Sequence, residues 1–192
     1  GTGCPNTWTE TINIRPIPVA DATAAPLFGC PPLEVSVNNL SIDADFYFWD
    51  YRDGNTSVGP APLPHIYTEP GIYNIMLRAS DEFGCGHDSV VAIVQIYEVP
   101  VVSFETEPDR QCGVPVEYCF ENNSENGGDY RWDFGNSQSS TDNNPCVIYD
   151  TPGDYTISLV ATNEFLCETR TEVPITVYGT PVAGFSVPDS IL

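Results

Sequence analysis

The chain contains no lysine. Its six basic residues are all arginine and face 27 acidic residues, which gives a formal net charge of −21 over 192 residues. The missing lysine excludes Schiff-base chemistry and the cation of a P-loop. The excess of negative charge repels phosphate groups, so we expect neither nucleic-acid binding nor adhesion to anionic lipid.

Long apolar runs, helical periodicity and paired cysteine motifs are also missing. No apolar run approaches the roughly 18 residues of a membrane-spanning helix, so we expect no membrane insertion by this segment. The seven cysteines form no CxxC pair, and 18 prolines and 15 glycines describe a turn-rich chain. Cysteine usage of this kind is typical of an oxidising compartment, so we expect an extracellular protein. No signal-peptide pattern is recognisable, and Gly1 suggests a cut within a longer protein.

Catalytic residue patterns are missing too. The two histidines, His65 and His87, lie in separate segments without a His-x-x-x-His spacing. The sequence has no GxSxG motif and offers no catalytic partner for a cysteine. We therefore expect no enzyme and no cofactor, apart from the calcium considered below.

A long repeat organises the chain. The segment 45–81 recurs in altered form at 129–163, and Tyr149 stands in the second copy at the place of Tyr67 in the first. The repeat predicts one module used at least twice. We expect the end of a preceding module at 1–16, complete modules at 17–98 and 99–179, and the first strand of a following module at 180–192.

The hydrophobic pattern of the first complete module alternates with a period of two, which indicates β-strands. On the longest expected strand, Ile75 and Leu77 share one side while Asn74 and Arg78 share the other. Tyr47 and Trp49 should face the apolar side from a neighbouring strand. The sequence therefore predicts an all-β protein of two-sheet sandwiches. The strands are expected at 19–23, 33–38, 46–51, 65–67, 72–80 and 89–97.

The repeated motif W-D-F/Y, a Gly turn, H/V-x-Y and T-x-P-G-x-Y-x-I-x-L-x-A-x-D/N resembles the PKD domain, an immunoglobulin-like sandwich. In the first copy it is carried by Trp49, Asp50, Asp53, Gly54, His65, Tyr67, Pro70, Gly71, Tyr73, Leu77 and Asp81. In the second copy it is carried by Trp132, Asp133, Gly135, Tyr149, Pro152, Gly153, Tyr155 and Leu159. Val147 replaces His65 in the second copy.

This resemblance implies a non-catalytic spacer or adhesion module at the cell surface. It favours a rigid, disulfide-stapled stalk or filament of a bacterial adhesin, serving adhesion or gliding motility. The expected partners are neighbouring PKD-like modules, with surface polysaccharide or other proteins as further candidates. The alternative function is an accessory carbohydrate- or protein-binding module of a secreted hydrolase.

Five cysteines occupy two repeat positions. Cys30 and Cys112 precede the second strand of their modules, and Cys4, Cys85 and Cys167 lie in the final hairpin. Pairing inside a module, Cys30 with Cys85 and Cys112 with Cys167, would have to span a strand of about 25 to 30 Å, whereas bridged Cα atoms lie about 4.4 to 6.8 Å apart. We therefore prefer an inter-module bond, Cys30–Cys167, and partners outside this chain for Cys4, Cys85 and Cys112. The pairing inside a module remains the alternative.

Cys119 and Cys146 occur only in the second module. Alternation points Val116, Tyr118 and Phe120 inward and Cys119 outward, and it likewise points Cys146 outward. Two outward cysteines on neighbouring strands predict a cross-strand disulfide.

Polar and aromatic residues in turns supply the remaining candidate sites. Asp50, Asp53, Asn55, Asp133 and Asn136 could bind Ca²⁺, although such residues more often fix their turns by accepting backbone hydrogen bonds. Sequons mark Asn39, Asn55 and Asn122 for N-glycosylation, and Ser89 and Ser190 resemble a bacterial O-glycosylation acceptor. Tyr51, Phe83 and Phe165 could stack on sugars if exposed, but a structural contact beside the hairpin cysteine explains Phe83 and Phe165 more simply.

Overall fold

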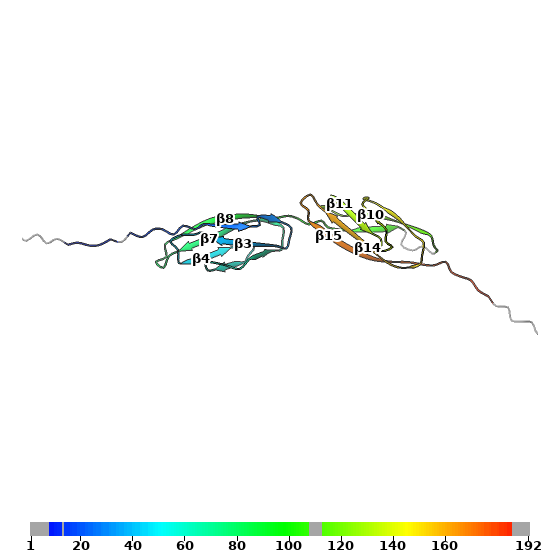
Figure 1. Cartoon of the computed structure of the whole chain (residues 1–192), viewed down its shortest axis with the longest axis horizontal. Coiled ribbons are helices and arrows are strands. Elements are labelled where there is room, and N and C mark those ends of the chain that lie inside the picture. The colour runs from blue at the N-terminus through cyan, green and yellow to red at the C-terminus, as the bar shows by residue number, and fades with distance from the viewer. Residues whose placement is uncertain (1–7, 13, 108–112, 186–192) are drawn as a thin grey trace, which may run out of the picture. The chain divides into compact units, whose positions relative to one another are not determined.

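The computed structural model describes residues 8–12, 14–107 and 113–185 (Figure 1). Within these ranges all regular secondary structure is β, in 15 strands without a helix. The all-β prediction is therefore confirmed. The described residues divide into two compact units: the first comprises the residues up to 28, 32–68 and 72–95, and the second comprises 29–31, 69–71 and those from 96 onward.

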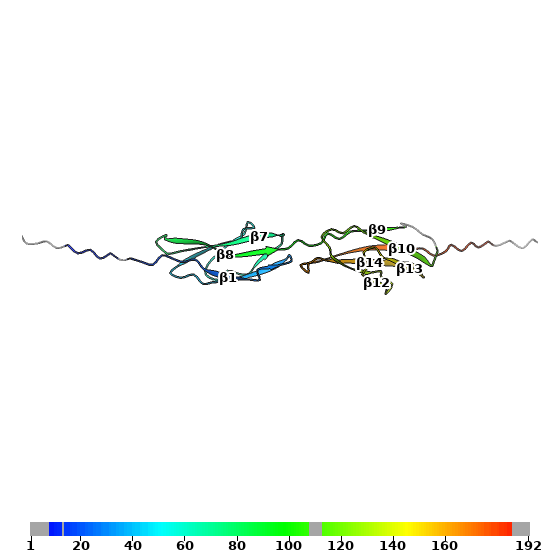
Figure 2. The ribbon, with the colours of Figure 1, turned by 90° about the horizontal axis from the view of Figure 1, so that it is seen from above.

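The first unit contains two antiparallel sheets, and Figure 2 shows β1 and β7 in different layers. The three-stranded sheet has the order β1 (Ala22–Ala25), β3 (Leu33–Asn39) and β6 (His65–Tyr67). The five-stranded sheet has the order β2 (Phe28–Gly29), β8 (Gly86–Ile96), β7 (Gly71–Ser80), β4 (Phe46–Asp50) and β5 (Thr56–Val58).

The core of the first unit lies between these sheets. Trp49, Tyr67, Ile75 and Leu77 are fully buried. Two of the buried aromatics have partners for their polar atoms: Trp49 Nε1 donates to the Gly59 carbonyl at 3.0 Å, and the Tyr67 hydroxyl donates to the Tyr51 carbonyl at 3.0 Å. Each of these two rings thus adds buried apolar area without leaving an unpaired donor.

The second unit repeats the two-sheet arrangement. One sheet has the order β13 (Cys146–Tyr149), β10 (Val116–Asn122) and β9 (Phe104–Glu107). The other has the order β12 (Ser139–Ser140), β11 (Asp129–Asp133), β14 (Gly153–Thr162) and β15 (Glu168–Val177). Trp132 is fully buried against Phe120, with ring centroids 5.5 Å apart, and its Nε1 donates to the Asp142 carbonyl at 2.9 Å.

The alternation of apolar and polar residues predicted correctly which side of each long strand is buried, with one exception. Ile75 and Leu77 in β7, and Ile157 and Leu159 in β14, are fully buried as predicted. Ser158, expected on the wet face, is only 5% exposed. It lies between its register partners Asp133 on β11 and Glu172 on β15, on an inner strand of the four-stranded sheet.

The first strand, two short strands and the ends of the chain differ from the sequence prediction. β1 begins at Ala22, and Val19 contributes only an isolated bridge to Ile42. The short strands β2 and β5 were not predicted. The strands expected within 1–16 and 180–192 are absent from the described parts of these segments, 8–12, 14–16 and 180–185, where no strand of the described chain pairs with them.

Candidate functional site

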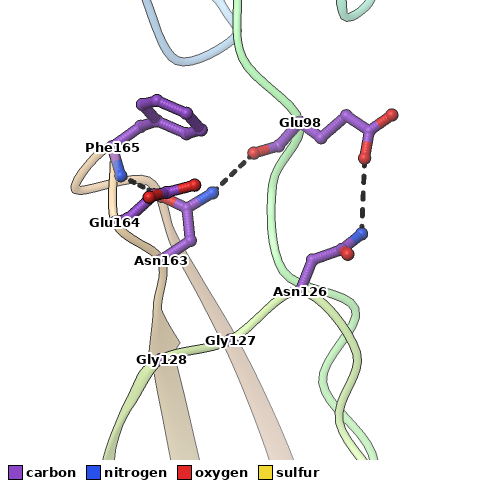
Figure 3. A pocket seen from close by; sticks show the side chains of 7 residues that line it. All are labelled: Glu98, Asn126, Gly127, Gly128, Asn163, Glu164 and Phe165. Carbon is purple, nitrogen blue, oxygen red and sulfur yellow. Dashed lines mark hydrogen bonds between the residues drawn. The ribbon is translucent and has the colours of Figure 1, made fainter.

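The loop between β14 and β15 is held by the side chain of Asn163. Its Oδ1 accepts hydrogen bonds from the backbone N–H groups of Phe165 at 3.0 Å and Cys167 at 2.9 Å. Its Nδ2 donates to the carbonyl oxygen of Glu98 at 2.7 Å, as Figure 3 shows. One amide therefore fixes both the turn and the position of its cysteine.

A hollow beside this loop is lined by Glu98, Asn126, Gly127, Gly128, Asn163, Glu164 and Phe165 (Figure 3). Asn126 Nδ2 donates to Glu98 Oε2 at 3.4 Å, and Phe165 stacks on Tyr97 with ring centroids 4.0 Å apart. The lining contains no histidine, cysteine or hydroxyl side chain. The hollow thus has the chemistry of a structural contact, in which the Glu98 carboxylate is bound by Asn126 and Glu164 is the other acidic group of the lining.

Cys167, which this loop positions, is buried and bonded to Cys30, with the two Cα atoms 5.5 Å apart. The alternative bonds Cys30–Cys85 and Cys112–Cys167 are therefore absent, because both Cys30 and Cys167 are already paired. Cys85 is a free, exposed thiol. Cys4 and Cys112 lie outside the described residues.

The corresponding loop of the first unit has the same construction. Asp81 Oδ1 accepts hydrogen bonds from the N–H groups of Phe83 at 3.0 Å and Cys85 at 2.8 Å. The Arg15 guanidinium lies 3.9 Å from the centroid of the Phe83 ring. Arg15 precedes Phe83 by the same spacing that separates Tyr97 from Phe165. Cys85 is thus presented in the same kind of loop as Cys167.

Cys119 and Cys146 face each other in register on β10 and β13 and form the second disulfide, with a Cα separation of 4.0 Å. With Glu117 they are the one group of three His, Cys, Asp or Glu side chains close enough to share a metal ion in the described ranges. Because the two thiols are bonded to each other, this group is not a metal site.

Four of the five calcium candidates accept hydrogen bonds within their own turns, and the fifth, Asn55, donates to Asp53. The Oδ1 atom of Asp50 accepts from the Arg52 N–H at 2.8 Å, and that of Asp133 accepts from the Gly135 N–H at 2.9 Å. Asp53 and Asn136 bond the N–H groups two residues later, those of Asn55 and Gln138, each at 3.0 Å. These bonds give the five residues a structural role, and calcium binding stays a prediction.

Asp53 also binds His65, the first residue of β6. His65 Nε2 lies 2.7 Å from Asp53 Oδ2, and the imidazole stacks on Tyr51 at 4.1 Å between centroids. Burial opposes ionisation of Asp53, but hydrogen bonds from Asn55 and His65 outweigh it and lower the pKa of this carboxyl. Burial raises the pKa values of Tyr51 and Tyr67. The other histidine, His87, accepts the Ala20 N–H through Nδ1 at 3.0 Å.

The aromatic candidates are placed differently from one another. The assumption that Tyr51 is exposed is wrong, because its ring packs against His65 and is only 3% exposed. Phe83 and Phe165 are exposed in part and make the ring contacts described above. Phe46 and Phe48, which were not among the candidates predicted from the sequence, are 60% and 44% exposed on the outer side of β4. The signal was available, since they alternate with the inward residues Tyr47 and Trp49.

The glycosylation candidates occupy ordered strands and turns. Asn39 and Asn122 accept the N–H groups of Ser41 and Ser124, and Asn55 Nδ2 donates to Asp53. Ser89 is partly buried in β8, and Ser190 lies outside the described residues. Glycosylation of these residues stays a prediction.

The sequence profile of the family described as "PKD domain" matches residues 13–96 and again residues 98–177, so it covers most of the chain in two consecutive copies. The chain belongs to the PKD domain family. The chain therefore contains two tandem PKD units, which correspond to the two compact units, although residues 29–31 and 69–71 of the second compact unit belong to the first PKD match. The resemblance seen in the sequence is confirmed.

Solved structures similar to this chain include single PKD domains. The PKD1 domain of Vibrio anguillarum Epp is 32% identical, with 43% of this chain and 96% of that chain covered and a TM-score of 0.38. The PKD1 domain of the Vibrio cholerae metalloprotease PrtV is 29% identical, with 42% and 99% covered and a TM-score of 0.37. A structure of carbohydrate-binding modules from the β-sandwich superfamily is 25% identical, with 43% and 35% covered and a TM-score of 0.40.

The described residues contain no helix with the length and apolar character needed to cross a bilayer.

Proposed function

We propose that the chain is a non-catalytic structural repeat of a secreted bacterial protein, in which PKD units are linked by disulfides into a stiff stalk or filament at the cell surface. Adhesion or gliding motility is the role that such a stalk serves. The observation that carries this proposal is the Cys30–Cys167 bond, because Cys30 lies in the first family match and Cys167 in the second.

This bond changes how the chain responds to tension. Cys30 and Cys167 are 137 residues apart in sequence, yet their Cα atoms are 5.5 Å apart. A force applied to the ends of the chain passes through the disulfide and bypasses everything between the two cysteines. Both β-sandwich cores lie almost wholly within the bypassed segment, so the bond protects them from forced unfolding.

The exposed thiol of Cys85 extends the same scheme. Its loop is held like that of Cys167, with Asp81 in the place of Asn163 and Arg15 in the place of Tyr97. We propose that Cys85 bonds a preceding PKD unit at the position equivalent to Cys30. Cys112 would bond the hairpin cysteine of a following unit, and Cys4 would bond a unit further upstream. The net charge of −21 would keep neighbouring stalks apart.

Single-molecule stretching of the whole chain by its two ends tests the role of the bond. Under oxidising conditions the segment between Cys30 and Cys167 should release no length. After reduction it should release roughly 450 Å, at about 3.3 Å per residue. Cys30→Ser should lengthen under oxidising conditions, whereas the control Cys119→Ser/Cys146→Ser should not, because its lost bond lies inside the bypassed segment.

Equal extension of the oxidised and reduced chains would contradict the mechanical role. Location is tested separately, by labelling intact cells with an antibody against this chain. Surface labelling is expected, and labelling seen only after permeabilisation would exclude a cell-surface stalk.

A further inference from the structure

The outer side of the five-stranded sheet in the first PKD unit is apolar. Phe46, Phe48 and Val58 are 60%, 44% and 73% exposed on the neighbouring strands β4 and β5. Met76 on β7 and Ile93 on β8 alternate with buried residues and so point the same way. We call these five residues the outer apolar face.

The β-sandwich itself does not require this face. In the second PKD unit the positions of Phe46 and Phe48 are occupied by Asp129 and Arg131, and the same strand pairing forms. The fold therefore does not need the exposed apolar side chains that the first unit carries on this sheet. Apolar groups gathered at a surface are typical of an interaction site.

Two hollows join across this face. One is lined by Phe46, Phe48, Val58 and Arg78, among others, and the other by Phe48, Arg52, Met76 and Arg78, among others. Because Phe48 and Arg78 line both, the hollows form one trough across β5, β4 and β7. Because the two hollows lie side by side across neighbouring strands, an extended chain could contact both at once.

Charged groups border the trough in balanced pairs. Arg52 lies 3.2 Å from Asp50, and Arg78 lies 3.7 Å from Asp88, and all four side chains are partly or largely exposed. The charges of these two pairs sum to zero, and the carboxylate of Asp45, which also lines the trough, leaves a formal charge of −1 on a chain of net charge −21. The trough thus offers apolar surface together with guanidinium donors and carboxylate acceptors, with nearly balanced charge.

We propose that this trough binds a neutral polysaccharide. Sugar rings present C–H groups on their faces and hydroxyl groups around their edges, which complement Phe46 and Phe48 and the Arg–Asp pairs respectively. An anionic glycan or a nucleic acid would be repelled by the chain as a whole. A second copy of this chain would bring together two molecules of charge −21, which also disfavours that occupant. This binding goes beyond the structural role and does not depend on it.

Native gel electrophoresis in gels containing hydroxyethylcellulose, arabinoxylan or galactomannan tests the proposal with the whole chain. At least one glycan should retard the chain. The variant Phe46→Asp/Phe48→Arg, which takes the residues of the second unit, should lose at least tenfold in affinity. The control Ile66→Arg changes an exposed apolar residue on the other sheet of the same unit and should bind normally. Near-UV circular dichroism of each variant checks that the unit is folded.

Absence of retardation in all three gels would overturn the proposal, as would unchanged binding by the folded double variant. Sedimentation velocity distinguishes the other occupant: a concentration-dependent dimer of the parent chain, lost in the double variant, would make the face a self-association surface instead. The stretching experiment is independent of these results, so either proposal can fail without the other.

Discussion

The two PKD units fix the same strand in different ways. In the first unit β6 is tied to the Trp-Asp turn by the His65–Asp53 hydrogen bond of 2.7 Å. In the second unit Val147 and Asn136 stand at the positions of His65 and Asp53, and β13 is joined to β10 by the Cys119–Cys146 bond. A partly buried polar pair and a covalent bond thus hold equivalent strands of the two units.

The outer sides of the larger sheets differ as well. The first unit exposes phenylalanines on β4 where the second exposes Asp129 and Arg131 on β11. The inner sides are nearly the same, because Trp49 and Trp132 are both fully buried and both donate their indole N–H to a carbonyl. Folding constrains the inner face, whereas the outer face can vary with function.

The largest expected effect tests whether the two cores are equivalent. Trp49→Ala and Trp132→Ala should each destabilise their own unit by about 3 to 5 kcal/mol, because each removes a fully buried indole and its hydrogen bond. Calorimetry of each variant, in which the transition of the unaltered unit serves as the reference, would measure both. A cost confined to one of the two would show that the cores differ.

Removal of the second unit's disulfide comes next. Cys119→Ala/Cys146→Ala opens a loop of 27 residues and should cost the second unit about 3 kcal/mol. The first unit should be unaffected, since its equivalent strand is held by His65 and Asp53. Calorimetry of the oxidised protein, in which Cys30–Cys167 is kept, would show one transition lowered; a shift of both would contradict the separation of roles.

The acid dependence of the first unit depends on Asp53. Its lowered pKa means that the carboxylate stabilises the folded unit above about pH 4 and that this contribution is lost as the pH falls further. The substitution Asp53→Asn introduces the residue of the second unit. It should lower the free energy of unfolding of the first unit by about 1 to 2 kcal/mol at neutral pH and should weaken the dependence of that free energy on acid pH. Urea unfolding of the parent and the variant at several pH values between 2 and 7 would measure the change. If the stability of both falls equally with pH, groups other than Asp53 cause the acid dependence.

The smallest expected effect concerns the outer apolar face. Phe46→Asp/Phe48→Arg should change the stability of the first unit by no more than about 0.5 kcal/mol per residue, because both side chains are exposed. A much larger loss in thermal unfolding would mean that these side chains serve the fold. In that case the exposed Phe46 and Phe48 would be explained by stability and would no longer indicate a binding site.

The sequence alone determined the architecture of each unit. Strand alternation is a local property, so Ile75 and Leu77 could be assigned to the core from their spacing, and the repeat carried the assignment to Ile157 and Leu159. The WD and PG motifs then identified the family. Cys119 and Cys146 could be placed opposite each other for the same reason, since both lie on strands whose inward side is marked by aromatic residues.

Only the tertiary structure decided what depends on distant segments. Tyr51 is buried because His65, which belongs to a later strand of the other sheet, stacks on its ring, and no local pattern encodes that contact. The choice between Cys85 and Cys167 as the partner of Cys30 likewise rests on the path of the whole chain. The trough exists because Phe48 and Arg78 come together as register partners on β4 and β7, a closeness set by strand pairing and not by the order of residues.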